Sequence, residues 1–188
     1  MTDAELMDAF ADGESDALGE IISRYKTPLF NYLLRITGNA DVAEDLFQDV
    51  FVKIVRSPKA YGERFKFSAW LFTVAHHAAM DYFRRGSAQK TVALDGDAEN
   101  QGLAERLVSG EPGPDQAVQN LELKRRIEKA LALLSGEQRE VFYLRHYSGL
   151  SFKEIAVLLK IPLGTALARM SRAAAVLRRE LGDKELSA

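Results

Sequence analysis

Three hydrogen-bond acceptors at helical spacing are the first residues in this sequence that suggest a binding site. Asp45, Gln48 and Asp49 lie at positions i, i+3 and i+4, so a helix brings their side chains to one face. An acidic patch of this kind suits the basic side chains of a protein partner. A solvated helix face without a partner is the alternative, and the spacing taken by itself favours it.

The segment after this helix interleaves basic and aromatic side chains. Within residues 61–70, Arg64 and Lys66 alternate with Phe65, Phe67 and Trp70. Cations that follow a phosphate backbone, beside rings that stack on bases, are the chemistry of single-strand nucleic-acid capture, where each stacked base contributes roughly 1 to 3 kcal/mol. Core packing is the alternative for these rings, and it has at least equal weight for Phe65 and Trp70.

A helix-turn-helix is predicted near the C-terminus. A short helix, a tight turn and a long helix follow one another over residues 151–181. Arg169 and Arg172 share one side of the long helix, and Thr165 at its start offers a hydroxyl group to a phosphate. A helical hairpin with arginines on a solvated face is the alternative, since short matches to this layout occur by chance.

Two features of this pattern indicate that direct base reading is modest. Leu167 and Ala168 place apolar groups where polar readers of base edges are expected. Lys160 occupies a turn position at which glycine would relieve a left-handed backbone. The core between the two helices is expected to contain Ile155, Leu158, Leu159, Ile161 and Leu163.

Apolar spacing predicts helices almost throughout, and no segment shows the sustained period-two alternation of a half-buried strand. The expected fold is all-α, with two small helical domains joined by a flexible acidic linker and the helix-turn-helix in the C-terminal domain. Thr27 as N-cap, with Pro28 in the first turn, is expected to open a new helix that Gly38 stops. Helices are predicted over residues 18–25, 28–37, 41–54, 68–85, 121–134, 136–147, 152–159 and 164–181.

Glycine, proline and acidic residues separate the two helical regions. We therefore predict a first domain over residues 1–86, a linker over 87–117 with a weak helical turn at 103–108, and a second domain over 118–188. The net charge of -2 hides a segregation, because residues 1–52 contain eleven acidic and three basic residues, whereas residues 53–90 contain two acidic and eight basic ones. This segregation predicts two different partners for the first domain.

The composition argues against catalytic and metal-binding classes. The absence of cysteine removes disulfides, thiolate nucleophiles and the usual structural zinc sites. His77 and Asp81 are four residues apart and can share a ligand, but two ligands without a third partner make a weak metal site. We predict no catalytic residue, no metal and no cofactor. Because no run of about twenty apolar residues occurs and the N-terminal residues are acidic, a cytoplasmic protein is expected.

Several segments resemble one known family, in order and at the right separations. Residues 41–51 (DVAEDLFQDVF), 67–71 (FSAWL) and 80–85 (MDYFRR) are similar to the second domain of the extracytoplasmic-function sigma factors of bacterial RNA polymerase. Residues 134–142 (LSGEQREVF), 151–156 (SFKEIA) and 162–165 (PLGT) resemble the fourth domain of that family. The likeness covers nearly the whole chain except the linker.

The resemblance implies a transcription initiation factor that is not an enzyme, whose partners are core RNA polymerase and promoter DNA. Asp45, Gln48 and Asp49 would dock on the clamp helices of the large polymerase subunit. Unpaired bases of the minus-ten element would be bound by Lys66, Phe67, Ser68, Trp70, Thr73, His77, Arg84 and Arg85. The minus-thirty-five element would be contacted by Arg145, Ser151, Thr165, Arg169 and Arg172.

The resemblance also implies control by an anti-sigma factor, and membrane contact only through such a partner if that partner is itself membrane-bound. His76 and His77 stand where an arginine and an asparagine are often found, so melting contacts or promoter choice are expected to differ. Leu167 and Ala168 replace the usual lysine and serine. An ordinary helix-turn-helix regulator is the rival class, and it would not require the acidic helix and the aromatic segment of the first domain.

Overall fold

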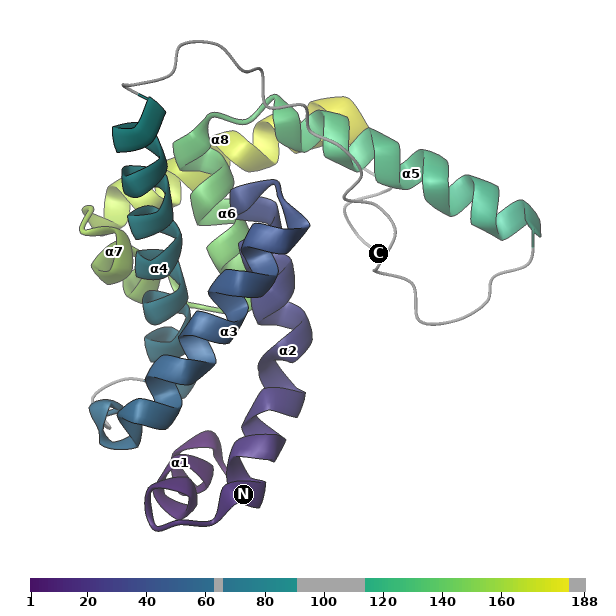
Figure 1. The fold of residues 1–188 in the computed structure, drawn as a ribbon. Coiled ribbons are helices and arrows are strands. Elements are labelled where there is room, and N and C mark those ends of the chain that lie inside the picture. Colours follow the sequence, from purple (N-terminus) through teal and green to yellow (C-terminus); the bar gives the residue numbers. More distant parts are fainter. Residues whose placement is uncertain (63–65, 91–113, 183–188) are drawn as a thin grey trace. The chain divides into compact units, whose positions relative to one another are not determined.

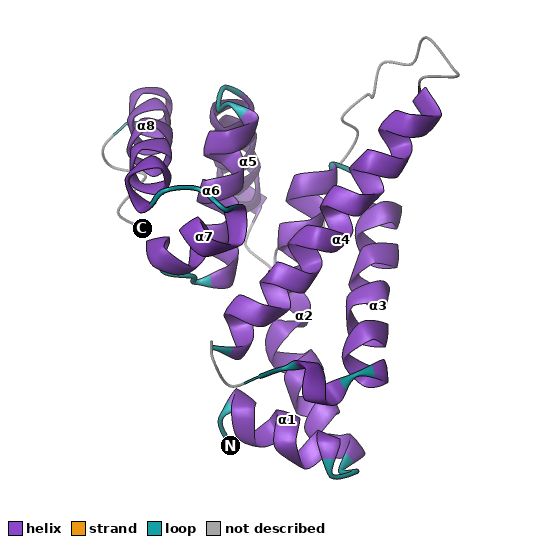
Figure 2. Ribbon diagram, turned by 90° about the vertical axis from the view of Figure 1, so that its left-hand side faces the viewer, coloured by secondary structure: helices purple, strands orange, loops and turns teal. Residues whose placement is uncertain are grey.

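The computed structural model describes residues 1–62, 66–90 and 114–182, and every regular element within these ranges is helical (Figure 1, Figure 2). The chain divides into two compact units, with the helices of the first half in one unit and nearly all of the remaining helices in the other. The predicted all-α fold with two domains is therefore confirmed. The elements are α1 (Asp3–Ala11), α2 (Ser15–Thr37), α3 (Ala40–Arg56), η1 (Pro58–Ala60), α4 (Phe67–Lys90), α5 (Pro114–Ala132), α6 (Gly136–Ser148), α7 (Phe152–Leu159) and α8 (Leu163–Leu181).

The first unit is a bundle in which α2, α3 and α4 pack against one another. Helix α1 lies against α2 and η1 at one end of the bundle (Figure 1). Each helix buries one apolar face, because removal of apolar surface from water drives the packing. In α3 this face consists of Ala43, Leu46, Val50, Phe51 and Ile54.

Helix α2 corrects one prediction, because Pro28 lies inside a continuous helix and does not open a new one at Thr27. Proline in a helix interior costs about 3 kcal/mol through a lost hydrogen bond and a steric clash. Burial on both sides of the proline, at Ile21 and at Leu29, offsets this cost by packing against the other helices. Gly38 ends the helix as predicted, with a left-handed φ of 69° and its N–H bonded to the carbonyl of Leu34.

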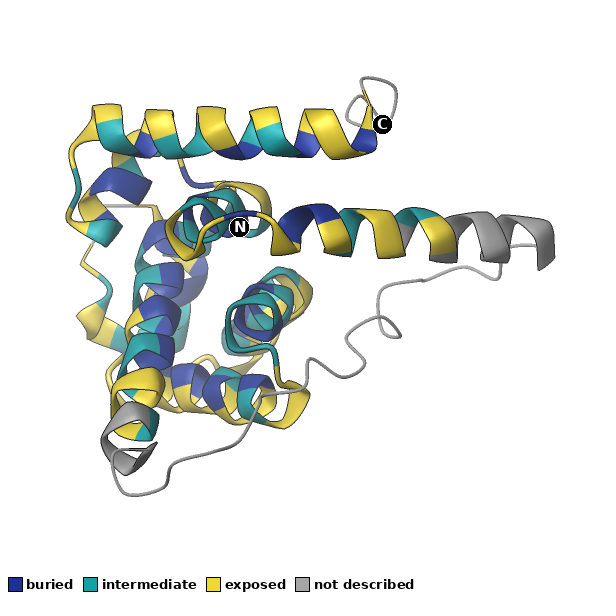
Figure 3. Cartoon of the chain, turned by 90° about the horizontal axis from the view of Figure 1, so that it is seen from above, coloured by how far each residue is buried: buried dark blue, intermediate teal, exposed yellow. Residues whose placement is uncertain are grey.

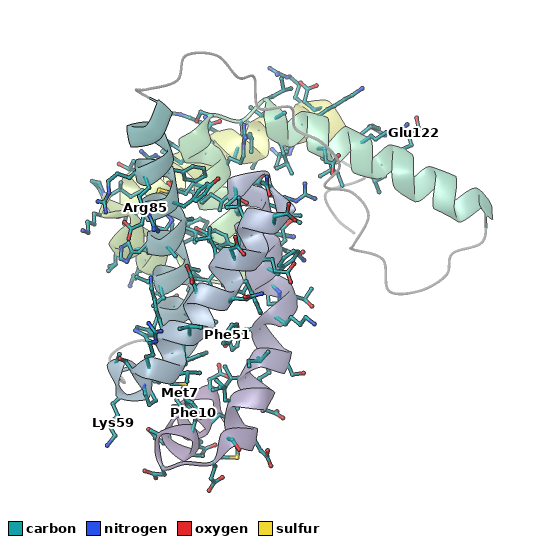
Figure 4. All side chains as sticks on the ribbon, viewed as in Figure 1. Met7, Phe10, Phe51, Lys59, Arg85 and Glu122 are labelled. Atoms are coloured by element: carbon teal, nitrogen blue, oxygen red, sulfur yellow. The ribbon has the colours of Figure 1, made fainter. Side chains whose placement is uncertain are left out.

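Helix α1 was not predicted from the sequence. Its first turn is fixed by a capping box, in which the backbone N–H of Glu5 donates to the Thr2 hydroxyl and the backbone N–H of Thr2 donates to the Glu5 carboxylate. The Arg24 guanidinium and the Tyr25 hydroxyl of α2 both donate to the Asp3 carboxylate, at 2.9 and 2.5 Å. These contacts attach α1 to the bundle, together with the buried side chains of Leu6 and Met7, of which Met7 is labelled in Figure 4.

The second unit is built around α8, which packs against both α5 and α7. Figure 3 shows exposed residues along one side of α8 and buried ones along the side that faces α5. Ser135 with Gln138, and Ser151 with Glu154, form capping boxes at the starts of α6 and α7. The predicted helix boundaries in this unit are confirmed to within a few residues, except that α5 begins earlier, at Pro114.

The predicted linker overlaps the ends of two helices, since α4 continues to Lys90 and α5 begins at Pro114. Gly86 therefore does not end α4. Residues 91–113, which include the weak helical turn predicted at 103–108, lie outside the described residues. The domain boundaries 1–86, 87–117 and 118–188 stay predictions.

Candidate protein-binding and nucleic-acid-binding surfaces

The acidic face of α3 is exposed to solvent. We use this name for the outer side of the helix, opposite its buried apolar face; it consists of Asp41, Glu44, Asp45, Gln48 and Asp49. Asn39 caps the helix by accepting hydrogen bonds from the N–H groups of Asp41 and Val42, at 2.9 and 3.1 Å. The carboxylates therefore project from a rigid helix whose other side is fixed in the core.

Two exposed valines extend this face toward the end of α3. Val52 and Val55 are 43% and 50% exposed, although the neighbouring Val50 and Ile54 are fully buried. Val52 follows Gln48 and Asp49 by four and three residues, so it lies on the same side of the helix. These valines were not predicted as binding residues, although their spacing from Gln48 and Asp49 could have identified them.

Five of the residues predicted to bind the minus-ten element lie along one face of α4, which we call the basic strip. Successive members are four, three, four and seven residues apart, which keeps them on one side of a helix with 3.6 residues per turn. None of them is buried. The basic strip consists of Lys66, just before the first residue of α4, and of Trp70, Thr73, His77 and Arg84.

The other residues predicted for this site have different surroundings. Ser68 follows Lys66 by two residues and therefore points to another side of the helix, and Arg85, which is exposed (Figure 4), lies beside the strip and not on its axis. Tyr82 and Phe83 are exposed aromatic residues near the end of α4, with ring centroids 5.6 Å apart. Residues 63–65, which include Arg64 and Phe65, lie outside the described residues.

Phe67 lies at the centre of an aromatic cluster at the start of α4. Its ring is 2% exposed, with centroid distances of 5.3, 5.3 and 5.7 Å to the rings of Tyr25, Tyr61 and Trp70. Aromatic pairs at such distances are favourable in edge-to-face or tilted orientations. Phe67 therefore does not present its face to a base in this structure, whereas the half-buried Trp70 retains an exposed part.

The two adjacent histidines of α4 have opposite environments. His77 is exposed on the basic strip, while His76 is 7% exposed and lies 3.1 Å from the Tyr32 hydroxyl, measured at Nδ1. Burial, with a smaller contribution from the charge of His77, lowers the pKa of His76 to about 4. His76 is thus a neutral core residue and only His77 is available to a ligand.

The helix-turn-helix has the predicted layout. Helix α7 ends at Leu159, and its C-cap residue Lys160 has a left-handed φ of 54° and ψ of 44°, as expected for a position that favours glycine. Pro162 is the N-cap of α8. Ile155 and Leu158 are buried as predicted, and Leu159 and Ile161 are half-buried. The prediction for Leu163 was wrong, because this residue is 39% exposed at the first position of α8.

A pocket of about 360 Å³ lies between the start of α6 and the first half of α8. It contains three of the residues predicted to contact DNA, namely Thr165, Arg169 and Arg172. The Arg169 guanidinium forms an ion pair with the Glu137 carboxylate at 2.7 Å. The full lining is Ser135, Glu137, Gln138, Gly164, Thr165, Ala168, Arg169 and Arg172.

The Arg169 side chain also acts on a second carboxylate of α6. Burial raises the pKa of Glu140, and the positive charge of Arg169 partly opposes this effect. Arg169 therefore connects α8 to α6, whereas Arg172 is more exposed. Of the three predicted DNA-binding residues that line the pocket, Arg172 is the most exposed.

The remaining two predicted residues flank the turn between α6 and α7, with Arg145 in the last turn of α6 and Ser151 at the N-cap of α7. The Arg145 guanidinium lies over the Phe152 ring, 5.4 Å from its centroid, in cation–π geometry. Ser151 caps α7, since its hydroxyl accepts from the Glu154 N–H at 3.3 Å. The structure thus divides the five residues into a pocket group and a turn group.

Within the described ranges, no group of three or more His, Cys, Asp or Glu residues lies close enough to hold a metal ion. Asp81, the other half of the weak metal pair, accepts a hydrogen bond from Arg84 at 2.9 Å. None of the helices in the described part of the chain combines the length and apolar character needed to cross a membrane.

Comparison with known protein families identifies both units. Residues 21–89 match the family model for sigma-70 region 2, and residues 124–177 match the model for sigma-70 region 4. The chain is 31% identical over 174 residues to the ECF RNA polymerase sigma factor SigW of Bacillus subtilis, with 91% of this chain and 92% of SigW covered. It is 33% identical over 180 residues to the RNA polymerase sigma factor CarQ of Myxococcus xanthus, with 96% and 98% covered. The protein therefore belongs to the extracytoplasmic-function (ECF) sigma factors of RNA polymerase.

Solved structures support the fold. The structure of CnrH in complex with the cytosolic domain of CnrY is similar with a TM-score of 0.65 and 23% identity, over 97% of this chain and 99% of CnrH. The sigma factor RpoE of Bartonella quintana, in complex with the anti-sigma factor NepR, has a TM-score of 0.65 and 24% identity over 89% and 98%. As a sigma factor, the protein is a transcription initiation factor with a DNA-binding helix-turn-helix, and it is not an enzyme.

Proposed function

We propose that the two units bind different partners of the sigma factor. The first, over residues 1–86, binds core RNA polymerase through the acidic face of α3 and holds opened minus-ten DNA on the basic strip of α4. The second, over residues 118–188, places α8 in the major groove of the minus-thirty-five element. The observation that carries this proposal is that surfaces of opposite charge lie on two helices, α3 and α4, that pack together in one bundle.

The acidic face supports the polymerase contact through its exposure and its rigidity. Asp45, Gln48 and Asp49 form its centre, and Val52 adds an apolar contact at the edge. Charge complementarity mainly provides specificity and fast association, while apolar area adds affinity. A basic partner surface with a hydrophobic rim at one end fits this combination.

The basic strip supports the contact with single-stranded DNA through its length and composition. From Lys66 to Arg84 it extends about 27 Å at roughly 1.5 Å per residue, with cations near both ends. Trp70 and His77 offer rings for stacking, and Thr73 donates its hydroxyl to the Ala69 carbonyl at 2.6 Å, which leaves lone pairs for a base donor. Phe67 contributes by holding Trp70 in place from the core side. Ser68 and Arg85 would contact the strand at the margins of the strip.

The second unit supports the duplex contact through α8 and its neighbours. Arg172 and Thr165 line the pocket at the start of this helix, where N–H groups also point outward. Arg145 and Ser151 would add phosphate contacts from the turn before α7. Phosphate contacts fix position, and base contacts specify sequence. Arg169 would join them only when DNA competes with Glu137.

We further infer that an anti-sigma factor holds the protein inactive until it is needed. The similar structures of CnrH and of RpoE were solved with the cytosolic domain of CnrY and with the anti-sigma factor NepR. Exposed surfaces on both units give a competitor large areas to cover. In this proposal the protein is cytoplasmic, and any membrane contact is made by a membrane-bound anti-sigma factor.

Charge reversal on α3 tests the polymerase contact. We expect the pair Asp45→Lys and Asp49→Lys in the full chain to weaken binding to core polymerase by about 10-fold or more, since each reversal replaces an attraction worth up to ~1 kcal/mol with a repulsion. The matched control is the pair Asp8→Lys and Asp12→Lys, which reverses two exposed acids at the end of α1 and leaves the acidic face intact. Fluorescence anisotropy against labelled core polymerase provides the affinities. Equal losses in both pairs, or no loss in the α3 pair, would contradict the proposed contact.

A further inference from the structure

Two exposed leucines mark the first half of α8. Leu163 and Leu167 are 39% and 45% exposed and lie four residues apart, so both occupy the same side of the helix. Ala166, Ala173 and Leu177 of the same helix are buried. Single exposed leucines are common on protein surfaces, but this pair stands at the start of the helix that enters DNA in a helix-turn-helix.

The surroundings of Leu167 are polar and cationic. Ala168, Ser171 and Arg172 are the exposed residues that follow it, one, four and five positions later, and they complete one outward face with it. Ala168 and Arg172 also line the pocket that contains Thr165. Leu167 is thus an apolar side chain beside the Arg172 guanidinium and the Ser171 hydroxyl. This combination fits an anionic partner that also presents a small apolar group.

Duplex DNA has one such group in its major groove. Each base pair presents hydrogen-bond donors and acceptors there, and thymine alone adds a C5 methyl group. Phosphates on either side of the groove would meet Arg172 and the donors at the start of α8, while the methyl group would meet the branched end of Leu167. A protein partner would have to supply both a carboxylate for Arg172 and an apolar group for Leu167, whereas duplex DNA carries its phosphates and the thymine methyl group in one regular arrangement.

We propose that Leu167, assisted by Ala168, reads the methyl group of a thymine in the minus-thirty-five element. This inference rests on the proposed function of the second unit and specifies what its α8 recognises. Burial of one methyl group is worth about fourfold in affinity, so the contact produces a preference for thymine and not an absolute requirement. Because Leu167 has no hydrogen-bonding group, its contact gives no further discrimination among the remaining bases.

Replacement of thymine by deoxyuridine tests the contact, since it removes only the methyl group. Holoenzyme assembled from core polymerase and the full chain selects duplexes from a pool of random sequence. Each thymine of the enriched upstream element is then replaced by deoxyuridine, and the affinities are measured for wild-type holoenzyme, for Leu167→Ser and for the matched control Leu133→Ser. Leu133 is another exposed leucine of the same unit, outside the pocket lining and outside α8.

The expected result is a loss of about fourfold at one thymine with wild-type and Leu133→Ser holoenzymes, and no loss at that position with Leu167→Ser. 5-Methylcytosine at the same position should restore more affinity than cytosine. Two results overturn the inference: no thymine sensitive to loss of its methyl group, or equal sensitivity in Leu167→Ser. A selection that enriches no duplex would instead refute the proposed DNA binding, so the two failures are distinguishable.

Discussion

Mild acid should destabilise the first unit, because its core contains a neutral histidine. The pKa of His76 is lowered from 6.5 to about 4 by burial. Below pH 6.5 the unfolded chain therefore binds a proton that the folded chain does not accept, and stability falls as the pH decreases from 6.5 to about 4. The full effect is about 3 kcal/mol, at roughly 1.4 kcal/mol per pKa unit, and about 2 kcal/mol of it is lost between pH 7 and pH 5.

Trp70 makes the assay specific to the first unit, since it is the single tryptophan of the chain and belongs to α4. Urea unfolding of the full chain, followed by tryptophan fluorescence at pH 7 and pH 5, gives the two stabilities. His76→Gln retains a hydrogen-bonding group near the Tyr32 hydroxyl but does not titrate, so its pH-dependent loss should be smaller than that of the wild type by about 2 kcal/mol.

The matched control is His77→Gln, which removes the neighbouring exposed histidine. It should lose nearly as much stability between pH 7 and pH 5 as the wild type does. An unchanged pH-dependent loss in His76→Gln would refute the reasoning, because the acid sensitivity would then originate in other groups of the bundle.

Three further substitutions test interactions and backbone strain inside the individual units. Asp3→Ala should destabilise the first unit by about 1–2 kcal/mol in the same fluorescence assay, because it removes the acceptor of Arg24 and Tyr25; an unchanged urea midpoint would contradict this role. Lys160→Gly should stabilise the second unit by about 0.5–1 kcal/mol, seen as slower amide exchange in α7 and α8, since glycine adopts a left-handed backbone without strain; faster exchange would show that the strain is absent. Glu137→Gln should release Arg169, so that holoenzyme binds duplex about two- to threefold more tightly with a steeper salt dependence, and an unchanged salt slope would show that Arg169 does not reach phosphate.

Local signals made most of the fold predictable from the sequence. Ser135 with Gln138, and Ser151 with Glu154, are capping boxes that the sequence displays directly, and both form. Gly38 ends its helix for an equally local reason. A cap needs only neighbouring residues, so tertiary packing rarely changes it.

Predictions that depend on tertiary packing were less reliable. Thr27 followed by Pro28 is typical of a helix start, but burial of Ile21 before the proline and of Leu29 after it keeps α2 continuous. The capping box of Thr2 and Glu5 was present in the sequence and was missed, because α1 is short and gains its stability from contacts with α2 and η1.

Among the predicted binding residues, too, features set by local spacing were predictable and features set by tertiary packing were not. The acidic residues of α3 are exposed as their spacing suggested, because a helix with one apolar stripe must place them outside. For aromatic residues the sequence left core packing and base stacking open, and the structure separates the buried Phe67 from the half-buried Trp70. The ion pair of Arg169 with Glu137 joins α8 to α6, two helices that are far apart in the sequence, so no local pattern could have indicated it.

Mapping of transcription start sites tests most directly the claim that one bundle binds the polymerase through α3 and opened DNA through α4. Core polymerase is mixed with a genomic promoter library and either the wild-type chain or the pair Lys66→Ala and His77→Ala, two exposed residues of the basic strip, and the transcripts are sequenced. The wild-type chain should produce a discrete set of start sites that core polymerase alone lacks. The variant should bind core polymerase normally and yield about a tenth of the transcripts or fewer, because it loses a stacking contact of His77 worth roughly 1 to 3 kcal/mol and a phosphate contact of Lys66. No new start sites with the wild type, or equal output from the variant, would contradict the claim.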